Sequence, residues 1–326
     1  IMNYNYYRGA PDDSVGLVKT ASLIKAARAE VKNSVLVDNG DLLQGSPLGD
    51  YVAKVKGLEE NDVHPIYKAM NLLDYDAANI GNHEFNFGLP FLKQAIDDAN
   101  FPYTSANVFF DDHDTDDSND IPYFSPYLIQ QKNVLDVDGN THQLTIGYIG
   151  FVPPQVMQWD KSNLETRVKA KDIVDMAKRY VPQMKADGAD IIIAIPHSGL
   201  VTSERLGDDE NASFYLSQVA GIDAIMFGHA HRNFPGHSSY DGLVGVDNVK
   251  GTINGVAAVM PGYWGKYLGY IDLTLEKSAD DVWSVVDSES ILKPISQSNP
   301  DRSVTSLVES HAGIAEAVQH DHELVN

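Results

Sequence analysis

Five segments of the chain run apolar and then end in glycine, proline, aspartate or histidine. A strand inside a parallel sheet has this pattern, because both of its faces are covered and only its end meets a loop. The segments are 34–41 (SVLVDNGD), 143–154 (QLTIGYIGFVPP), 189–199 (ADIIIAIPHSG), 222–231 (IDAIMFGHAH) and 256–265 (VAAVMPGYWG). Apolar residues recur at helical spacing in 15–32, 62–72, 89–99, 171–187 and 211–220. This alternation predicts an α/β fold with functional groups at the carboxyl ends of the strands.

The pattern changes after Tyr267. Residues 267–277 and 281–290 alternate between apolar and polar, as the two strands of an antiparallel pair do, so we expect a mixed sheet. Residues 109–122 carry a dense acidic run without the spacing of an EF-hand, which favours a solvated loop over a calcium site. Residues 294–303 are polar and are expected to be a linker, and 304–326 a helix.

Composition narrows the classes of function. With 24 Lys and Arg against 46 Asp and Glu among 326 residues, the net charge of −22 disfavours nucleic-acid polymers and anionic membranes as partners. No segment has the roughly 20 apolar residues of a membrane span. The chain has no cysteine, so any metal ion must be bound by His, Asp, Glu or Asn. It begins at Ile1 rather than Met, and we expect that residues upstream have been removed.

Polar side chains of one chemical kind gather at the predicted strand ends. They are Asp41, Asn82, His83, His197, His229 and His231. A single histidine at a strand end is usually a hydrogen-bonded rim residue, but together these residues offer the oxygen and imidazole donors that suit Mn, Zn, Fe or Co. Gly228 and Ala230 leave room for a sharp turn at the His-x-His pair. Two cations roughly 3.5–4 Å apart would suit phosphoryl transfer.

Four blocks carry a resemblance to a known family: GDLLQG (40–45), GNHEFNFG (81–88), AIPHSG (194–199) and GHAH (228–231). In this order they resemble the calcineurin-like metallophosphoesterases, and within them the 5′-nucleotidase group. The longer stretches SVLVDNGDLLQGSPLGDY, IGYIGFVPPQVMQWDK and AIMFGHAHRNFPG are most similar to the bacterial 2′,3′-cyclic-nucleotide 2′-phosphodiesterase/3′-nucleotidase branch. The resemblance covers the chain to about residue 290 and implies a mixed-sheet sandwich with α/β/β/α layers.

The resemblance also implies roles for these residues. Asp41 would bridge two divalent metal ions (Mn, Zn, Co, Fe or Mg). Asn82, His197 and His229 would complete the protein ligands of one ion, and His231 would bind the other. His83 would be the catalytic histidine, protonating the leaving oxygen or stabilising its charge. The reaction implied is hydrolysis of 2′,3′-cyclic nucleotides and 3′-nucleotides by a hydroxide that the two metal ions activate.

Two departures from the family pattern qualify this expectation. Family members begin with a strand ending in Asp-x-His, which ligates one metal, and no such motif precedes IMNYNYYRG, so that metal site is expected to be incomplete in this chain. Asn86 stands where many 5′-nucleotidases have an aspartate paired with the catalytic histidine. Asn86 could support His83 only by a neutral hydrogen bond, and the cyclic-phosphodiesterase branch resembles this Asn form.

The expected organisation is a catalytic domain over 1–290, then a linker and helix over 291–326 leading to an absent carboxyl-terminal nucleotide-binding domain, to which the full protein would be covalently linked. The substrates would be small nucleotides in the periplasm, in nucleotide catabolism. The alternatives are a 5′-nucleotidase or UDP-sugar hydrolase, and an inactive or binding-only pseudo-phosphatase. The other histidines, His64 and His322 among them, are expected at the surface, and Trp159, Tyr263 and Trp264 as packing residues.

Overall fold

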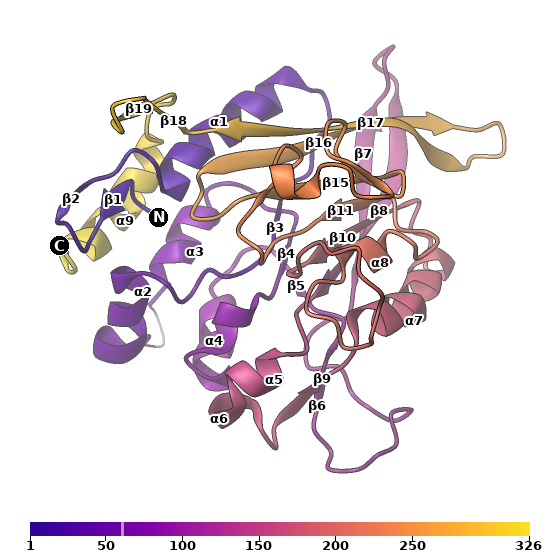
Figure 1. Ribbon diagram of the computed structural model, residues 1–326, viewed down its shortest axis with the longest axis horizontal. Coiled ribbons are helices and arrows are strands. Elements are labelled where there is room, and N and C mark those ends of the chain that lie inside the picture. The colour runs from indigo at the N-terminus through magenta and orange to yellow at the C-terminus, as the bar shows by residue number, and fades with distance from the viewer. Residues whose placement is uncertain (60–61) are drawn as a thin grey trace.

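A computed structural model describes residues 1–59 and 62–326, and within them two sheets pack face to face between layers of helices (Figure 1). The larger sheet has eight strands in the order β13-β14-β15-β11-β10-β8-β7, with β12 paired to β15. Its centre is parallel: β8 (Thr141–Phe151), β10 (Ile191–Pro196), β11 (Ala224–Met226) and β15 (Val256–Pro261). The antiparallel members are β7 (Leu128–Leu135), β12 (Asn233–Phe234), β13 (Val246–Asp247) and β14 (Thr252–Ile253).

The second sheet layer contains three parallel strands and a long hairpin. The parallel strands are β3 (Val37–Asp38), β4 (Ala77–Asn79) and β5 (Tyr103–Thr104), and the hairpin is β16 (Tyr267–Lys277) with β17 (Trp283–Pro294). Alternate residues of β10 divide between two cores: Ile193 packs among residues of this second layer, and Ile192 packs among residues of the helices behind the larger sheet. The predicted mixed sheet, antiparallel pair and α/β/β/α layering are therefore confirmed.

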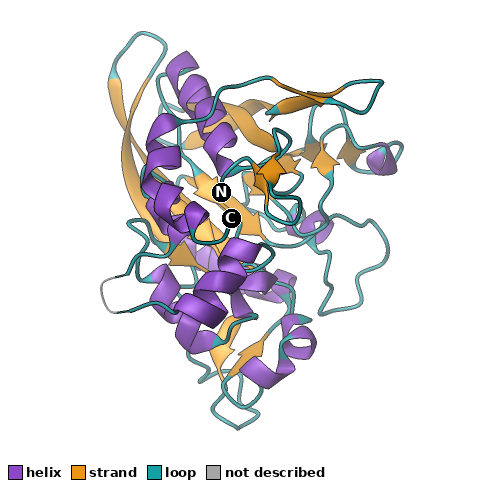
Figure 2. Cartoon of the chain, turned by 90° about the vertical axis from the view of Figure 1, so that its left-hand side faces the viewer, coloured by secondary structure: helices purple, strands orange, loops and turns teal. Residues whose placement is uncertain are grey.

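Helices cover both outer faces (Figure 2). α7 (Ile173–Ala186) and α8 (Ser213–Leu216) pack on the larger sheet. α1 (Leu17–Glu30), α3 (Pro65–Met70), α4 (Leu89–Ile96) and α9 (Ala312–Glu323) cover the second layer. The remaining elements of the described chain are β1 (Tyr4–Asn5), β2 (Ala10–Pro11), α2 (Pro47–Tyr51), η1 (Val52–Lys56), η2 (Asn82–Phe85), β6 (Val108–Phe110), α5 (Val156–Trp159), α6 (Lys161–Leu164), β9 (Val168–Ala170), η3 (Ser238–Tyr240), β18 (Ser296–Ser298) and β19 (Val304–Ser306). No helix among the described residues has the length and hydropathy to cross a bilayer.

The carboxyl-terminal segment differs from its expectation as a linker and continuous helix. Residues 296–306 form the hairpin β18–β19, because the Asp301 carboxylate accepts from the backbone and hydroxyl of Ser303 and closes the turn. The helix begins only at Ala312. α9 buries Ile314 and Val318 completely against α1 and α3, and Lys68 pairs with Asp321 across the same contact at 2.6 Å. α9 is thus part of the hydrophobic core of this domain.

Two histidines expected at the surface are buried. His64 is 2% exposed and accepts a hydrogen bond from the Ile66 amide at 3.2 Å, so it caps α3. Burial, reinforced by the nearby positive charges of Lys56 and Lys68, lowers the pKa of His64 to about 3. His322 is 8% exposed and contacts the ring of Tyr6. Composition alone did not identify either as a core residue.

The packing of α9 predicts that two alanine substitutions near this end of the chain differ in their effect on the free energy of unfolding. Ile314→Ala removes a fully buried side chain and should reduce the free energy of unfolding by about 2–5 kcal/mol. Leu324→Ala, at a residue 43% exposed, should change it by less than about 1 kcal/mol. Urea unfolding followed by circular dichroism measures both. Equal losses would show that α9 does not stabilise this core.

The buried cap predicts an acid dependence of stability. With a pKa of about 3 in the folded chain and about 6.5 when unfolded, His64 binds its proton only in the unfolded state between these values, so stability should fall as pH falls from 6.5 towards 3. His64→Asn keeps a capping acceptor and should reduce this loss by up to about 1.4 kcal/mol per pH unit. Urea midpoints from pH 6.5 to 4 test it, with exposed His113→Asn as control. Parallel pH profiles for both variants would contradict it.

Candidate metal centre and active site

The predicted site residues meet where the two sheets present the carboxyl ends of their parallel strands. Asp41 follows β3, Asn82 and His83 follow β4, His197 follows β10 directly, and His229 and His231 follow β11. Two side-chain amides join these loops. Asn39 donates to the carbonyl oxygens of Pro196 (2.8 Å) and Met226 (3.0 Å), and Asn79 donates to Asn39 Oδ1 (3.1 Å) and to Phe151 O (2.8 Å). The amides satisfy carbonyl groups that the ends of the strands leave free, and they hold the two sheets in register at this edge.

Glu84 holds the loop that carries Asp41. Its buried carboxylate accepts backbone N–H groups from Gly81 (2.7 Å), Asp41 (2.6 Å), Leu42 (2.5 Å) and Leu43 (3.2 Å). Asp41 itself has φ of 64°, in the left-handed region that is sparsely populated by residues other than glycine. Burial and the negative charge of Asp41 both raise the pKa of Glu84. The carboxylate therefore maintains a strained backbone that directs Asp41 into the site.

Asp41 and His197 form the first donor pair. His197 Nε2 lies 2.9 Å from Asp41 Oδ2, while His197 Nδ1 lies 2.6 Å from the carbonyl oxygen of Asn39. A carbonyl only accepts, so Nδ1 carries the proton and Nε2 faces the carboxylate. Burial alone would lower the pKa of His197, but Asp41 outweighs it and raises that pKa to about 8. Burial likewise opposes ionisation of Asp41, and the two histidines His197 and His83 lower its pKa to about 2.

Asn82 and His229 form the second donor pair. His229 Nδ1 lies 3.1 Å from Asn82 Oδ1, and His229 Nε2 lies 2.7 Å from Glu210 Oε1. Burial lowers the pKa of His229, so the ring is neutral, with its proton on Nε2 toward Glu210. The Nδ1 lone pair then faces the carbonyl oxygen of Asn82. The rings of His197 and His229 are 5.3 Å apart, so the two donor pairs are neighbours.

The turn at the His-x-His pair is made by the histidines themselves. His229 and His231 have φ of 70° and 54°. Gly228 has no positive φ, so its part in the turn is the room that it leaves, as expected from the sequence. A side chain there would approach Asn39 Nδ2 to 3.1 Å, so glycine is needed for close packing against the amide that joins the sheets. His231 is exposed and stacks on Tyr263, with ring centroids 5.0 Å apart.

His83 lies beside the first donor pair. Its backbone amide donates to Asp41 Oδ1 at 2.9 Å, which places its side chain next to that carboxylate. Its ring Nδ1 lies 2.6 Å from Asn86 Oδ1, the neutral contact expected from the sequence. The ring is partly exposed, so its other nitrogen is free to meet a substrate.

The donor chemistry fits a divalent cation at this edge. The facing atoms of the two pairs are 2.9 and 3.1 Å apart. Once His197 Nε2 gives up its proton, each pair offers two electron-pair donors at a spacing that suits two ligands of one ion bound at roughly 2.0–2.2 Å. Across residues 1–59 and 62–326, no three His, Asp or Glu side chains form a metal-binding group by themselves. The fit therefore depends on counting the carbonyl oxygen of Asn82 among the ligands. His231 stands apart from both pairs, and its role as ligand of a second ion stays a prediction.

Comparison with known proteins agrees with this geometry. Residues 14–233 match the model of the calcineurin-like phosphoesterase family, and the chain belongs to that family. It is 50% identical over 323 residues to the 2′,3′-cyclic-nucleotide 2′-phosphodiesterase/3′-nucleotidase of Salmonella typhimurium, covering 99% of this chain and 48% of the relative. It is 44% identical to the trifunctional nucleotide phosphoesterase protein YfkN of Bacillus subtilis, covering 98% of this chain and 22% of the relative.

A solved structure extends the likeness to three dimensions. The crystal structure of the calcineurin-like phosphoesterase YfkN superposes with a TM-score of 0.90 at 42% identity, covering all of this chain and 93% of that one. The family resemblance and the fold expected from it are thus confirmed. The chain spans about half the length of the Salmonella relative.

Three residues that contact the site residues were not predicted from the sequence: Glu84, Glu210 and Asp160. Glu84 stands inside the block GNHE, where a carboxylate among strand-end residues was a usable signal. Glu210 and Asp160 come from loops with no periodic pattern, and nothing in the sequence indicated what they contact. Trp159, expected to be a packing residue, stacks on His229 with ring centroids 5.7 Å apart.

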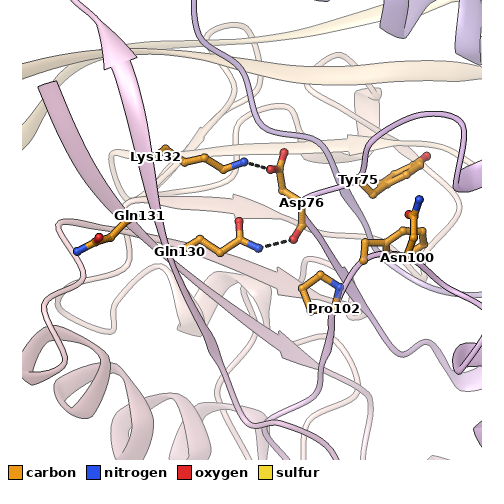
Figure 3. A pocket seen from close by; sticks show the side chains of 8 residues that line it. Tyr75, Asp76, Asn100, Pro102, Gln130, Gln131 and Lys132 are labelled. Carbon is orange, nitrogen blue, oxygen red and sulfur yellow. Dashed lines mark hydrogen bonds and ion pairs between the residues drawn. The ribbon is translucent and has the colours of Figure 1, made fainter. Parts of the chain in front are cut away.

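A separate cavity lies away from this site (Figure 3). It has a volume of about 400 Å³ and lies by the residues that precede β4 and β5, at the opposite end of those strands from Asp41 and His83. Asp76 in its wall is paired with Lys132, and its carbonyl oxygen accepts from Gln130 at 2.7 Å. Its polar groups contact one another, and it contributes nothing to the candidate site.

The role of Glu84 predicts a stability effect. Glu84→Gln keeps one acceptor oxygen but turns an amide donor toward backbone N–H groups, and each buried donor left without an acceptor costs about 1–3 kcal/mol. We expect a loss of at least that size in the free energy of unfolding, together with weaker binding of Mn²⁺ by calorimetry. Glu165→Gln, on a side chain 59% exposed, is the matched control. Unchanged stability and Mn²⁺ affinity in Glu84→Gln would contradict the assigned role.

Proposed function

We propose that the protein hydrolyses 2′,3′-cyclic nucleotides and 3′-nucleotides, with His83 facing the leaving ribose oxygen. The observation that carries this proposal is the placement of His83 by Asp41: one carboxylate belongs to the donor set and also accepts the His83 amide at 2.9 Å. The name of the Salmonella relative, at 50% identity over nearly the whole chain, supports the same substrate class.

The residues of the chain divide the work of this reaction. Asp41, Asn82, His197, His229 and His231 would hold two divalent cations, which when bound polarise phosphoryl oxygens and lower the pKa of water. In hydrolysis the oxygen of water bonds to phosphorus, the ester P–O bond breaks, and the leaving oxygen gains a proton. We assign delivery of that proton to Nε2 of the doubly protonated His83 ring, which keeps its other proton on Nδ1 toward Asn86 and regains one from the attacking water. Manganese and zinc suit the donor set equally, because it contains both oxygen and imidazole.

The same proposal covers the rest of the protein. Because the relatives are longer than this chain, we propose that the full protein has a carboxyl-terminal domain that binds the nucleoside. The absence of cysteine is compatible with a periplasmic location, which we include in the proposal. The expected division at residue 290 falls inside β17 (Trp283–Pro294), and α9 packs on the catalytic core, so we propose that the catalytic domain extends through α9.

A substrate and metal panel tests the proposal. The full-length gene product should bind two equivalents of Mn²⁺ or Zn²⁺ and release adenosine from 3′-AMP and 3′-AMP from 2′,3′-cyclic AMP, measured by chromatography. Faster turnover of 5′-AMP or UDP-glucose would favour the 5′-nucleotidase alternative. Binding of one equivalent or none, with no turnover, would favour a pseudo-phosphatase.

A substitution at His83 tests its role separately. His83→Ala should lower kcat for 3′-AMP by about 10²–10⁴-fold, the range that a general acid contributes. His237→Ala, at an exposed histidine next to η3, should leave kcat unchanged. Metal content measured on both variants separates a catalytic effect from a loss of binding. Unchanged turnover of 2′,3′-cyclic AMP in His83→Ala would exclude the assignment.

A further inference from the structure

A buried carboxylate contacts the catalytic loop without belonging to the donor set. Asp160 lies between α5 and α6 and is 7% exposed. Its two oxygens accept from a single side-chain donor, the amide nitrogen of Asn86, at 2.9 and 3.0 Å. In the described part of the chain no Lys, Arg or His side chain forms an ion pair with it. A buried charge with this one strong partner calls for a role beyond packing.

Asp160 is also in a position to cap a helix but does not. It occupies the N-cap of α6, where an aspartate ordinarily accepts a backbone amide of the first turn, and its side chain makes no such bond. Asp172 at the N-cap of α7 behaves in the ordinary way and accepts from the Asp175 amide at 2.8 Å. The carboxylate of Asp160 is thus directed to Asn86 rather than to its own helix.

This contact fixes which way the Asn86 amide points. Its nitrogen must face the carboxylate, because a flipped amide would place its oxygen against two negatively charged oxygens. Asn86 Oδ1 therefore faces His83 Nδ1 at 2.6 Å, and since that oxygen only accepts, the proton on Nδ1 is specified. The remaining nitrogen, Nε2, is left to meet the substrate.

The same short helix holds the backbone of the loop. Asn163, one turn after Asp160, donates its side-chain amide to the carbonyl oxygens of Phe85 (3.0 Å) and Asn86 (3.1 Å). Trp159, the residue before Asp160, stacks on His229. The segment 159–163 thereby contacts both the loop that carries His83 and a ring of the second donor pair.

We propose that Asp160 is a positioning residue for His83, acting through the oriented amide of Asn86. This inference rests on the proposed role of His83 toward the leaving group. It also accounts for asparagine at position 86, because the negative charge that orients its amide lies one side chain further from His83. The pair Asn86–Asp160 performs the orienting task that a single aspartate would perform at position 86.

The test is Asp160→Asn in the full-length gene product. Either orientation of the new amide can pair with Asn86, so the Asn86 oxygen is no longer held toward His83. With 3′-AMP, the ribose oxygen needs a proton to leave, so kcat should fall about tenfold. This is a fraction of the roughly 10²–10⁴-fold rate enhancement that a general acid contributes. With p-nitrophenyl phosphate, whose phenolate leaves unprotonated, kcat should change by less than about twofold. KM and metal content should stay unchanged.

A second variant distinguishes orientation from packing. Asn86→Asp alone should also lower kcat for 3′-AMP, because it places two carboxylates about 3 Å apart. Combined with Asp160→Asn it should restore most of the activity, since the amide introduced at position 160 can donate to the carboxylate introduced at position 86, and that carboxylate can accept from His83. Asp172→Asn, the same change at a carboxylate of similar burial, should leave kcat unchanged.

Nitrogen NMR of the His83 ring gives a readout independent of turnover. At a pH where the His83 ring is neutral, the parent protein should show its proton on Nδ1, and Asp160→Asn should show a mixture of the two tautomers. Equal losses for both substrates, no rescue in the double variant, or an unchanged tautomer in Asp160→Asn would each overturn the inference. If the parent protein turns over no nucleotide yet its tautomer responds as described, the proposed function fails while the positioning contact stands.

Discussion

The site depends on the buried carboxylate of Glu84. Four backbone N–H groups from two loops converge on it, and those loops carry Asp41, Asn82 and His83. Without that acceptor, the left-handed backbone at Asp41 would have no compensation for its strain, and the loops after β3 and β4 would have no reason to meet. Because Glu84 lies two residues from Asn82 on the same short helix η2, the loop that carries Asn82 and His83 also supplies the acceptor that holds the loop of Asp41.

The two sheets need a second connection, and side-chain amides provide it. Asn39 and Asn79 donate to carbonyl groups at the ends of β8, β10 and β11. An amide donates and accepts at once without charge, so it links buried carbonyl groups without the desolvation cost of a lysine, whereas a carboxylate has no donor to offer them. The same amide of Asn39 leaves little room for a side chain at Gly228, because a Cβ there would lie 3.1 Å from Asn39 Nδ2. The position of the candidate site residues is therefore a property of the junction between sheets and not of any one strand.

The sequence predicted the repeating units well and their junctions poorly. An apolar run such as that of β10 predicts a buried strand, because the side chains on both faces of the strand pack in a core. Asp41, His197 and His229 could be predicted as site residues because they follow strands whose carboxyl ends meet at one edge of the sheets. Glu84 lies among such strand-end residues and was overlooked. Glu210 and Asp160 could not be predicted in the same way, because their partners His229 and Asn86 are distant in sequence and no periodicity indicates a contact between loops. The hairpin β18–β19 was missed for a related reason: a turn closed by Asp301 forms within a stretch whose polar composition is typical of a linker.

Part of the acidic composition behind the net charge of −22 lies at this edge of the sheets. Asp38, Asp41 and Glu84 bring three carboxyl groups into one buried region, where burial raises the pKa of Asp38 to about 7 and also raises that of Glu84. Asp41 is held ionised by His197 and His83. A buried region with the negative charge of Asp41, two further carboxyl groups and two donor pairs is poorly arranged to attract a phosphate by itself and well arranged to attract a cation. The polarity of the site is thus set by its buried carboxyls, and the acidic surface elsewhere only keeps polymeric anions away.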